Sequence, residues 1–166
     1  LNSGTYNAEN IQISADFATT RTVACSGSVT LPTYCTMSGN TTYDTSITSV
    51  VFNTISQTSA KPSGYSDYTS VSTTVNLGSS QNLSVRVNTD GGFTCYIRAW
   101  IDWNGDGDFG DTNENYDLGS ASNVTNGSSS LSPFSISIPT TAIIGQTRLR
   151  IAVLYNAYPT LCSTNF

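Results

Sequence analysis

Six of the eleven acidic residues lie in one stretch of sixteen residues, 102–117, that contains no basic residue. Inside it, Asp102-Trp103-Asn104-Gly105-Asp106-Gly107-Asp108 places oxygen-bearing side chains at alternate positions of a loop interrupted by glycine. Hard cations such as Ca²⁺ take about six to eight oxygen ligands, and glycine lets a loop wrap closely enough to supply them. The stretch predicts a calcium-binding loop with these candidate ligands: Asp102, Asn104, Asp106, Asp108, Asp111 and Glu114.

The same loop matches only the first half of an EF-hand. Asp102, Asn104 and Asp106 stand at its first, third and fifth positions and Gly107 at its sixth, but Asn113 replaces the glutamate of position twelve. The preceding residues are typical of a strand, not of a helix. We therefore expect a calcium loop outside an EF-hand. The alternative is an acidic loop that is only solvated, in which carboxylates this dense would repel one another.

Composition excludes several other functions. Histidine is absent, which removes histidine-based triads, general bases and metal ligands. The sequence shows no combination of a catalytic nucleophile with a general base, so we expect that the protein is not an enzyme. The formal charge of −5 disfavours nucleic acid as a partner, and no apolar run approaches the roughly 18 residues of a membrane span.

Strand patterns surround the acidic loop. Residues 11–17 alternate strictly, with Ile11, Ile13, Ala15 and Phe17 on one face. Asp90-Gly91-Gly92 predicts a hairpin between two strong strands. No window shows a helical period, so the sequence predicts an all-β fold, an antiparallel β-sandwich of jelly-roll or Ig-like type. The other expected strands cover residues 22–25, 28–31, 47–55, 70–77, 82–88, 93–102, 134–138 and 147–155.

Three of these strands carry arginine and aromatic residues on one face. If residues 82–88, 95–101 and 147–153 share a sheet, its outer face presents a surface that can hold an anionic sugar by charge and stacking. The alternative is an ordinary solvated face with cross-strand pairs. The candidate glycan-contacting residues are Tyr96, Trp100, Arg98 and Arg150, with Arg86 and Arg148 on the same predicted face.

The chain has four widely spaced cysteines: Cys25, Cys35, Cys95 and Cys162. An even number without a CxxC pair, in a β-rich chain with a single lysine, predicts two disulfides and an oxidising compartment. Three pairings are possible, and the spacing alone does not choose between them.

Several segments resemble, in order, the GEVED domain, a β-sandwich module of secreted multidomain Bacteroidetes proteins. They are Tyr34-Cys35, Gly64-Tyr65-Ser66-Asp67-Tyr68-Thr69, Trp100-Ile101-Asp102-Trp103-Asn104-Gly105-Asp106-Gly107-Asp108-Phe109, Ile138-Pro139 and Gly145-Gln146-Thr147-Arg148-Leu149-Arg150-Ile151. The resemblance implies an extracellular, non-catalytic accessory or adhesive module over residues 34–166. The Gly-Glu-Val-Glu-Asp-Tyr strand that names the family is not found before Phe166.

Residues 1–33 form an extension that the resemblance does not require. Within it, residues 5–13 faintly resemble the missing strand, so we expect residues 9–17 to complete a sandwich, either of the same molecule or of a neighbour. With the domain placed at 34–166, we expect Cys35–Cys162 to tie its ends together and Cys25–Cys95 to fasten the extension. Cys25–Cys35 is the alternative to that pairing.

Two functions follow as expectations. The first is a structural subunit of a secreted or cell-surface filament, a head-to-tail homopolymer assembled by strand donation and stabilised by calcium and disulfides. The second is a non-catalytic carbohydrate-binding accessory module, with a polysaccharide as partner.

Overall fold

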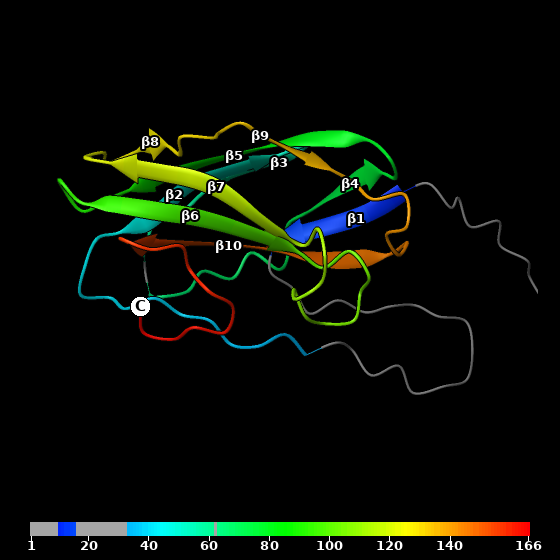
Figure 1. Ribbon diagram of the computed structural model, residues 1–166, viewed down its shortest axis with the longest axis horizontal. Helices are drawn as coiled ribbons and strands as arrows, with labels where there is room; N and C mark the ends of the chain where they lie inside the picture. The colour runs from blue at the N-terminus through cyan, green and yellow to red at the C-terminus, as the bar shows by residue number, and fades with distance from the viewer. Residues whose placement is uncertain (1–9, 16–32, 62) are drawn as a thin grey trace, which may run out of the picture.

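The computed structural model describes residues 10–15, 33–61 and 63–166, in which every regular element is a β-strand (Figure 1). In chain order the strands are β1 (Asn10–Ala15), β2 (Ser46–Phe52), β3 (Ile55–Thr58), β4 (Ser72–Asn76), β5 (Ser80–Asn88), β6 (Thr94–Ile101), β7 (Asn115–Ser122), β8 (Gly127–Ser128), β9 (Phe134–Ser137) and β10 (Gln146–Tyr155). No helix of the described residues is long and apolar enough to cross a membrane.

The strands form two sheets packed face to face, which confirms the predicted all-β sandwich. One sheet has the order β4-β1-β10-β6-β7, and the other the order β3-β2-β5-β8 with β9 also paired to β5. All these pairs are antiparallel except β1 with β10, which is parallel.

β1 lies in the middle of its sheet, although it comes from the N-terminal extension. It pairs with β4 from Asn10↔Asn76 to Ser14↔Ser72, and with β10 from Gln12↔Gln146 to Ala15↔Leu149. Removing β1 would therefore leave β4 and β10 with facing unpaired edges.

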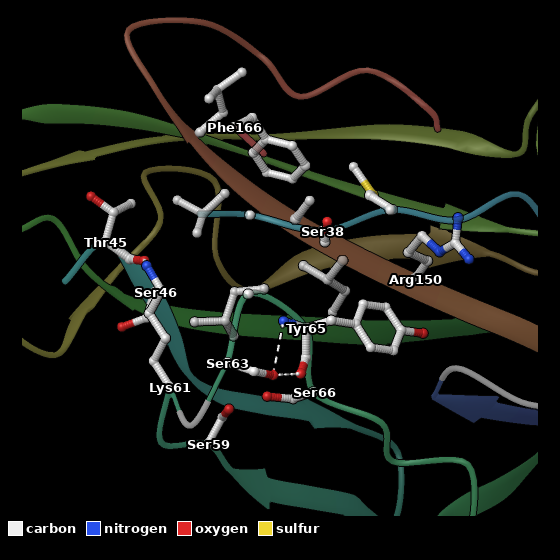
Figure 2. A pocket seen from close by; sticks show the side chains of 18 of the residues that line it. Ser38, Thr45, Ser46, Ser59, Lys61, Ser63, Tyr65, Ser66, Arg150 and Phe166 are labelled. Carbon is white, nitrogen blue, oxygen red and sulfur yellow. Dashed lines mark hydrogen bonds between the residues drawn. The ribbon is translucent and has the colours of Figure 1, made fainter. Parts of the chain in front are cut away.

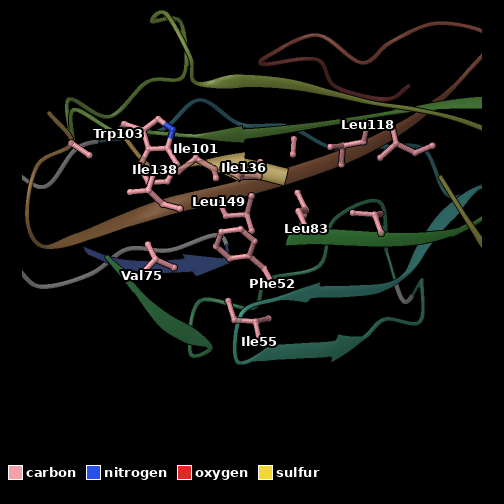
Figure 3. Packing of buried hydrophobic residues seen from close by; sticks show 14 of the residues in the cluster. Phe52, Ile55, Val75, Leu83, Ile101, Trp103, Leu118, Ile136, Ile138 and Leu149 are labelled. Atoms are coloured by element: carbon pink, nitrogen blue, oxygen red, sulfur yellow. The ribbon is translucent and has the colours of Figure 1, made fainter. Parts of the chain in front are cut away.

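The core lies between the inner faces of the two sheets (Figure 3). Alternation along β5 and β6 places Leu83, Val85, Ile97 and Ile101 at 0 % exposure. Burying a side chain of this size stabilises a fold by about 1.5–3 kcal/mol relative to leaving it exposed, so the central strands hold the sheets together. Trp103, the tryptophan of the acidic loop, closes one end of this core.

A second, smaller cluster of buried side chains lies on the outer face of the sheet that contains β6 and β10. Met37, Trp100, Phe109 and Ala152 are buried there, with Tyr34, Leu161 and Phe166 packed against them. Two arms, residues 33–40 and 156–166, supply the cover. They are joined by the Cys35–Cys162 disulfide, with a Cα–Cα distance of 5.3 Å, and by backbone bonds such as Asn40 N–H to Phe166 O at 2.8 Å.

These arms correct the expected sugar-binding face. Trp100 is 1 % exposed and Arg150 5 %, because residues distant in the sequence cover them. The three strands also do not share a sheet, since β5, which carries Arg86, belongs to the opposite one. Asp90-Gly91-Gly92 consequently connects the two sheets. The predicted hairpin at this position is therefore wrong.

Two other elements differ from the sequence prediction. The predicted strand at 47–55 is two strands, β2 and β3, which turn at Asn53 with a φ of 50°. β7 was not predicted because its sequence, Asn-Tyr-Asp-Leu-Gly-Ser-Ala-Ser, is polar and contains glycine. Its pairing with β6 supplies the stability that its composition lacks.

Candidate functional site

The acidic loop connects two paired strands of one sheet. β6 ends at Ile101 and β7 begins at Asn115, so residues 102–114 are held at both ends by the same antiparallel ladder. Gly105 and Gly107 have φ angles of 69° and 96°. These values are unfavourable for residues with a Cβ, which explains why glycine alternates with the acids.

Asp102 is buried and accepts hydrogen bonds from backbone N–H groups of the loop. It is 0 % exposed, and one of its carboxylate oxygens accepts Gly105 N–H at 2.5 Å. The other accepts Gly107 N–H at 3.0 Å and the Tyr34 hydroxyl at 2.6 Å. Among the candidate ligands, Asp102 is therefore a buried hydrogen-bond acceptor that shapes the loop.

Asp106, Asp108 and Asp111 come together at the exposed tip. Each offers a carboxylate oxygen, and these oxygens lie within 4.8 Å of one another. Asp106 Oδ1 accepts Asp108 N–H at 3.0 Å, and Asp108 Oδ1 accepts Gly110 N–H at 2.7 Å. The backbone N–H of Asp108 is the main cause of a lowered pKa for Asp106. The tip thus holds an ionised carboxylate beside two others.

Asn104 bridges this group. Its Nδ2 lies 3.0 Å from Asp106 Oδ2 and 2.7 Å from Asp111 Oδ2, while its Oδ1 accepts Asp106 N–H at 3.1 Å. Of the six predicted ligands, the structure therefore brings four together: Asn104, Asp106, Asp108 and Asp111.

Glu114 lies buried beneath the loop, at 1 % exposure. Its Oε1 accepts Trp103 N–H at 2.7 Å, whereas Oε2 has no hydrogen-bond partner among the described residues. Burial is the main cause that raises the pKa of Glu114 to about 7. A buried carboxylate oxygen without a donor is costly unless a proton or a cation compensates it.

Tyr34 couples the loop to the disulfide-linked arms. Besides its bond to Asp102, its ring lies 4.9 Å from that of Phe109 and 4.0 Å from the guanidinium carbon of Arg148. Burial, together with the carboxylate of Asp102, raises the pKa of the Tyr34 phenol. Ordering the loop therefore also orders the N-terminal arm.

The other predicted glycan contacts already have partners in the chain. Arg98 binds Asp117 at 2.5 Å and Pro159 O at 3.0 Å, and lies 4.9 Å from the Tyr158 ring centroid. The Tyr96 ring contacts the same tyrosine, with ring centroids 5.0 Å apart. These two side chains hold the C-terminal arm against the sheet.

Two of the predicted features extend beyond the described residues. Ile11, Ile13 and Ala15 lie in β1, whereas Phe17 lies outside the described residues. Cys95 is buried and forms no disulfide with a described residue, and Cys25 is not described. The Cys25–Cys95 bridge stays a prediction, while Cys35–Cys162 is present.

The sequence did not predict a cavity of about 480 Å³ at the open side of the sandwich (Figure 2). Its walls come mainly from β10, from β2 and from segments within residues 37–45, 59–61 and 63–71. Lys61 closes it by donating from Nζ to Thr45 O at 2.9 Å, and Gly39 N–H binds Gly64 O at 2.8 Å. Only contacts between distant segments create this cavity, so no local sequence pattern identifies it.

Comparison with known families gives one finding. The model of the GEVED domain matches residues 96–166, which comprise most of β6, the acidic loop, β7–β10 and the C-terminal arm. The match begins later in the chain than Tyr34, where the resemblance of the sequence begins. No curated protein and no solved structure matches the chain. Over residues 96–166 the comparison confirms the resemblance to the GEVED domain, an extracellular type of module, that the sequence motifs indicated.

Proposed function

We propose that this protein is a structural subunit of an extracellular filament or surface fibre, in which β1 of one copy completes the sheet of the next. The observation that carries the proposal is the place of β1. A strand from an N-terminal extension occupies the middle of a sheet, between β4 and β10, rather than an edge.

The link between β1 and the rest of the sandwich is long enough for exchange. Residues 16–32 separate Ala15 from Thr33, and seventeen extended residues span at most about 55–60 Å. The same backbone pairs form whether β1 completes its own sheet or that of a neighbour. Completion of a neighbour is a head-to-tail contact, and such contacts propagate as a fibre unless they close into a ring.

Closure within one chain is the competing arrangement. It gives the same hydrogen bonds without a polymer, and concentration then decides between the two because only exchange requires a second molecule. The role proposed is structural and involves no catalysis.

Calcium belongs to the same proposal. Ca²⁺ binds oxygen atoms at about 2.3–2.6 Å, so ligand oxygens within one coordination shell lie up to about 5 Å apart. The three tip carboxylates, within 4.8 Å of one another, satisfy this condition. Glu114, whose Oε2 has no hydrogen-bond partner among the described residues, lies under the same loop but outside this group of carboxylates. Through Tyr34, a bound ion would also stabilise the arms.

Carbohydrate binding is less well supported than the filament. Of its four predicted contacts, Trp100 and Arg150 are buried, and Arg98 and Tyr96 pack against the C-terminal arm. Migration of the protein in a gel containing polysaccharide tests this alternative directly, and retardation would favour it.

The filament proposal is tested by deleting residues 1–17. The full-length protein should form filaments visible by electron microscopy, and the deleted protein should give unstable or aggregating monomers because β4 and β10 lose their shared partner. Adding a peptide of residues 5–17 should restore the melting temperature of the deleted protein. A matched peptide with Ile11→Asp and Ile13→Asp should not.

Two outcomes would contradict the proposal. If the full-length protein is monomeric at every concentration by light scattering, closure within the chain is correct. If the deleted protein is a stable monomer with an unchanged melting temperature, the strand completes nothing.

A further inference from the structure

Tyr34, the neighbour of Cys35, connects the N-terminal arm to the acidic loop. Its hydroxyl donates to Asp102 Oδ2 at 2.6 Å. The same oxygen accepts Gly107 N–H at 3.0 Å, and Asp102 Oδ1 accepts Gly105 N–H at 2.5 Å. A single carboxylate therefore joins the arm to the backbone of the loop at two places.

A second set of contacts runs through Arg150 and Phe109. Arg150 Nη1 donates to Cys35 Sγ at 3.7 Å, and the guanidinium carbon lies 5.1 Å from the centroid of the Phe109 ring. Phe109 belongs to the acidic loop, is 2 % exposed and has its ring centroid 4.9 Å from that of Tyr34. The loop thus contacts the residues on which the disulfide acts directly.

The arm that carries Tyr34 depends on the disulfide for its position. Residues 33–40 contain no strand, and they are joined to the C-terminal arm by the Cys35–Cys162 bond and by single backbone bonds such as Ser38 N–H to Ser163 O at 3.1 Å. Segments held by few hydrogen bonds open locally at a small cost in free energy. Cys162 is exposed, so the disulfide is open to attack by a thiol.

We propose that the Cys35–Cys162 disulfide keeps the acidic loop in shape through Tyr34, and that reduction of this bond loosens the loop. In the reduction, a dithiol gives up two electrons and two protons and becomes a disulfide. The Cys35–Cys162 bond breaks, and each cysteine sulfur receives one proton.

The exposed tip of the loop follows from the same contacts. Gly105 and Gly107, whose amides Asp102 accepts, stand on either side of Asp106. Loosening these two amides moves the tip carboxylate between them, so the tip keeps its geometry only while the disulfide is oxidised. The inference goes beyond the proposed function, because it concerns the loop without a cation and holds whether or not filaments form.

The test is hydrogen–deuterium exchange of the full-length protein in excess chelator, read on peptides covering residues 102–114. Tyr34→Phe should raise exchange there roughly tenfold, the effect of losing one hydrogen bond to a carboxylate. Cys35→Ser combined with Cys162→Ser should raise it at least as much. Tyr158→Phe makes the same chemical change on the C-terminal arm, at a ring that packs against β6, and should leave the loop unchanged.

Peptides from β5, in the opposite sheet, separate loosening of the loop from unfolding of the sandwich. Their protection should stay at the wild-type level in all variants. Adding Tyr34→Phe to the double cysteine variant should change the loop little further, because both changes act through the same contacts.

A reciprocal measurement needs no cysteine variant. If the disulfide stabilises the bond between Tyr34 and Asp102, that bond stabilises the disulfide in return. Cys35 and Cys162 should therefore be reduced at a lower dithiothreitol concentration in Tyr34→Phe than in the wild type, as measured by alkylation and peptide mapping.

Three results would overturn the inference. They are unchanged loop exchange in Tyr34→Phe, unchanged loop exchange in a folded double cysteine variant, and equal reduction of the disulfide in Tyr34→Phe and the wild type. If the double cysteine variant fails to fold, the two measurements on Tyr34→Phe still decide. All are made without calcium and do not require filaments, so failure here is distinguishable from failure of the proposed function.

Discussion

Asp102 and Asp106 stand four residues apart in one loop, and the structure uses them in opposite ways. Asp102 is buried and accepts hydrogen bonds from two loop amides and a tyrosine, whereas Asp106 is exposed at the tip beside two other carboxylates. The first carboxylate fixes the loop, and the second is available to a cation. Substitution of the two should therefore have different consequences.

We expect Asp106→Ala to abolish the response of the protein to chelation. Binding to the folded state alone adds RT ln(1 + [L]/Kd), about 2.7 kcal/mol at a hundredfold excess of calcium over Kd. Chelator should lower the melting temperature of the wild type and leave the variant unchanged. Asp67→Ala, in a loop far along the sequence from the cluster, is the control. A wild type that retains no metal after dialysis and ignores chelator would refute the calcium site.

Glu114 predicts a pH dependence in the calcium-free protein. Its folded pKa of about 7 lies above the ordinary value of 4.5, so folding favours the protonated form. The stability that depends on this proton is complete below about pH 4.5 and is lost as pH rises through about 7. Urea unfolding at pH 5 and pH 8 should show wild type losing stability relative to Glu114→Gln. Parallel changes in the two proteins would show that the carboxyl group ionises normally.

The sequence identified the acidic loop, but it did not show which of its acids are buried and which are exposed. Alternating oxygens and glycines marked the loop, because side-chain type and spacing are local properties. Which acid is buried depends on Tyr34, a residue 68 positions from Asp102 that no local pattern connects to it. The same reason explains why the sequence placed Glu114 among the candidate ligands, although its side chain is buried.

At the scale of elements, the two disulfide-linked arms bring together residues from opposite ends of the described sandwich. Cys35 and Cys162 are 127 residues apart in sequence, and the arms they join cover Trp100 and Phe109. Strong strands such as β5, β6 and β10 were predictable from their alternation, because a half-buried strand shows its faces in its own sequence. The arms that cover Trp100 were not predictable, because a segment without regular structure has no alternation of apolar and polar residues.

Replacing Cys35 and Cys162 together by serine should destabilise the protein. On the chain-entropy model, a bridge that closes a loop of this length contributes roughly 4–5 kcal/mol. Denaturant midpoints under non-reducing conditions measure the loss, and the fluorescence of Trp100 should shift as its cover loosens. A double variant with the wild-type midpoint would show that packing alone holds the arms.

Non-reducing peptide mapping tests the second bridge. We expect a linked pair of peptides containing Cys25 and Cys95, which would anchor the extension beside β6. Alkylation of Cys95 in the denatured but unreduced protein would refute it. Burial raises the pKa of the Cys95 thiol, so this alkylation has to be done after denaturation.

At the scale of the whole molecule, head-to-tail exchange gives every filament one sheet without a donor. A peptide of residues 5–17 should occupy that place and stop growth at that end. Mean filament length, measured by electron microscopy, should therefore fall as peptide is added to full-length protein during assembly. The peptide with Ile11→Asp and Ile13→Asp is the control, and lengths that ignore both peptides would contradict exchange of β1.

The pairing of β1 on both sides also has a mechanical consequence. Within the proposed filament, tension between subunits would act along β1, parallel to its length, and both ladders would resist it in shear. In that direction the bonds to β4 and β10 are loaded together, whereas peeling an edge strand loads them one after another. A central strand thus makes a tougher joint than an edge strand of equal length, with the same number of residues exchanged.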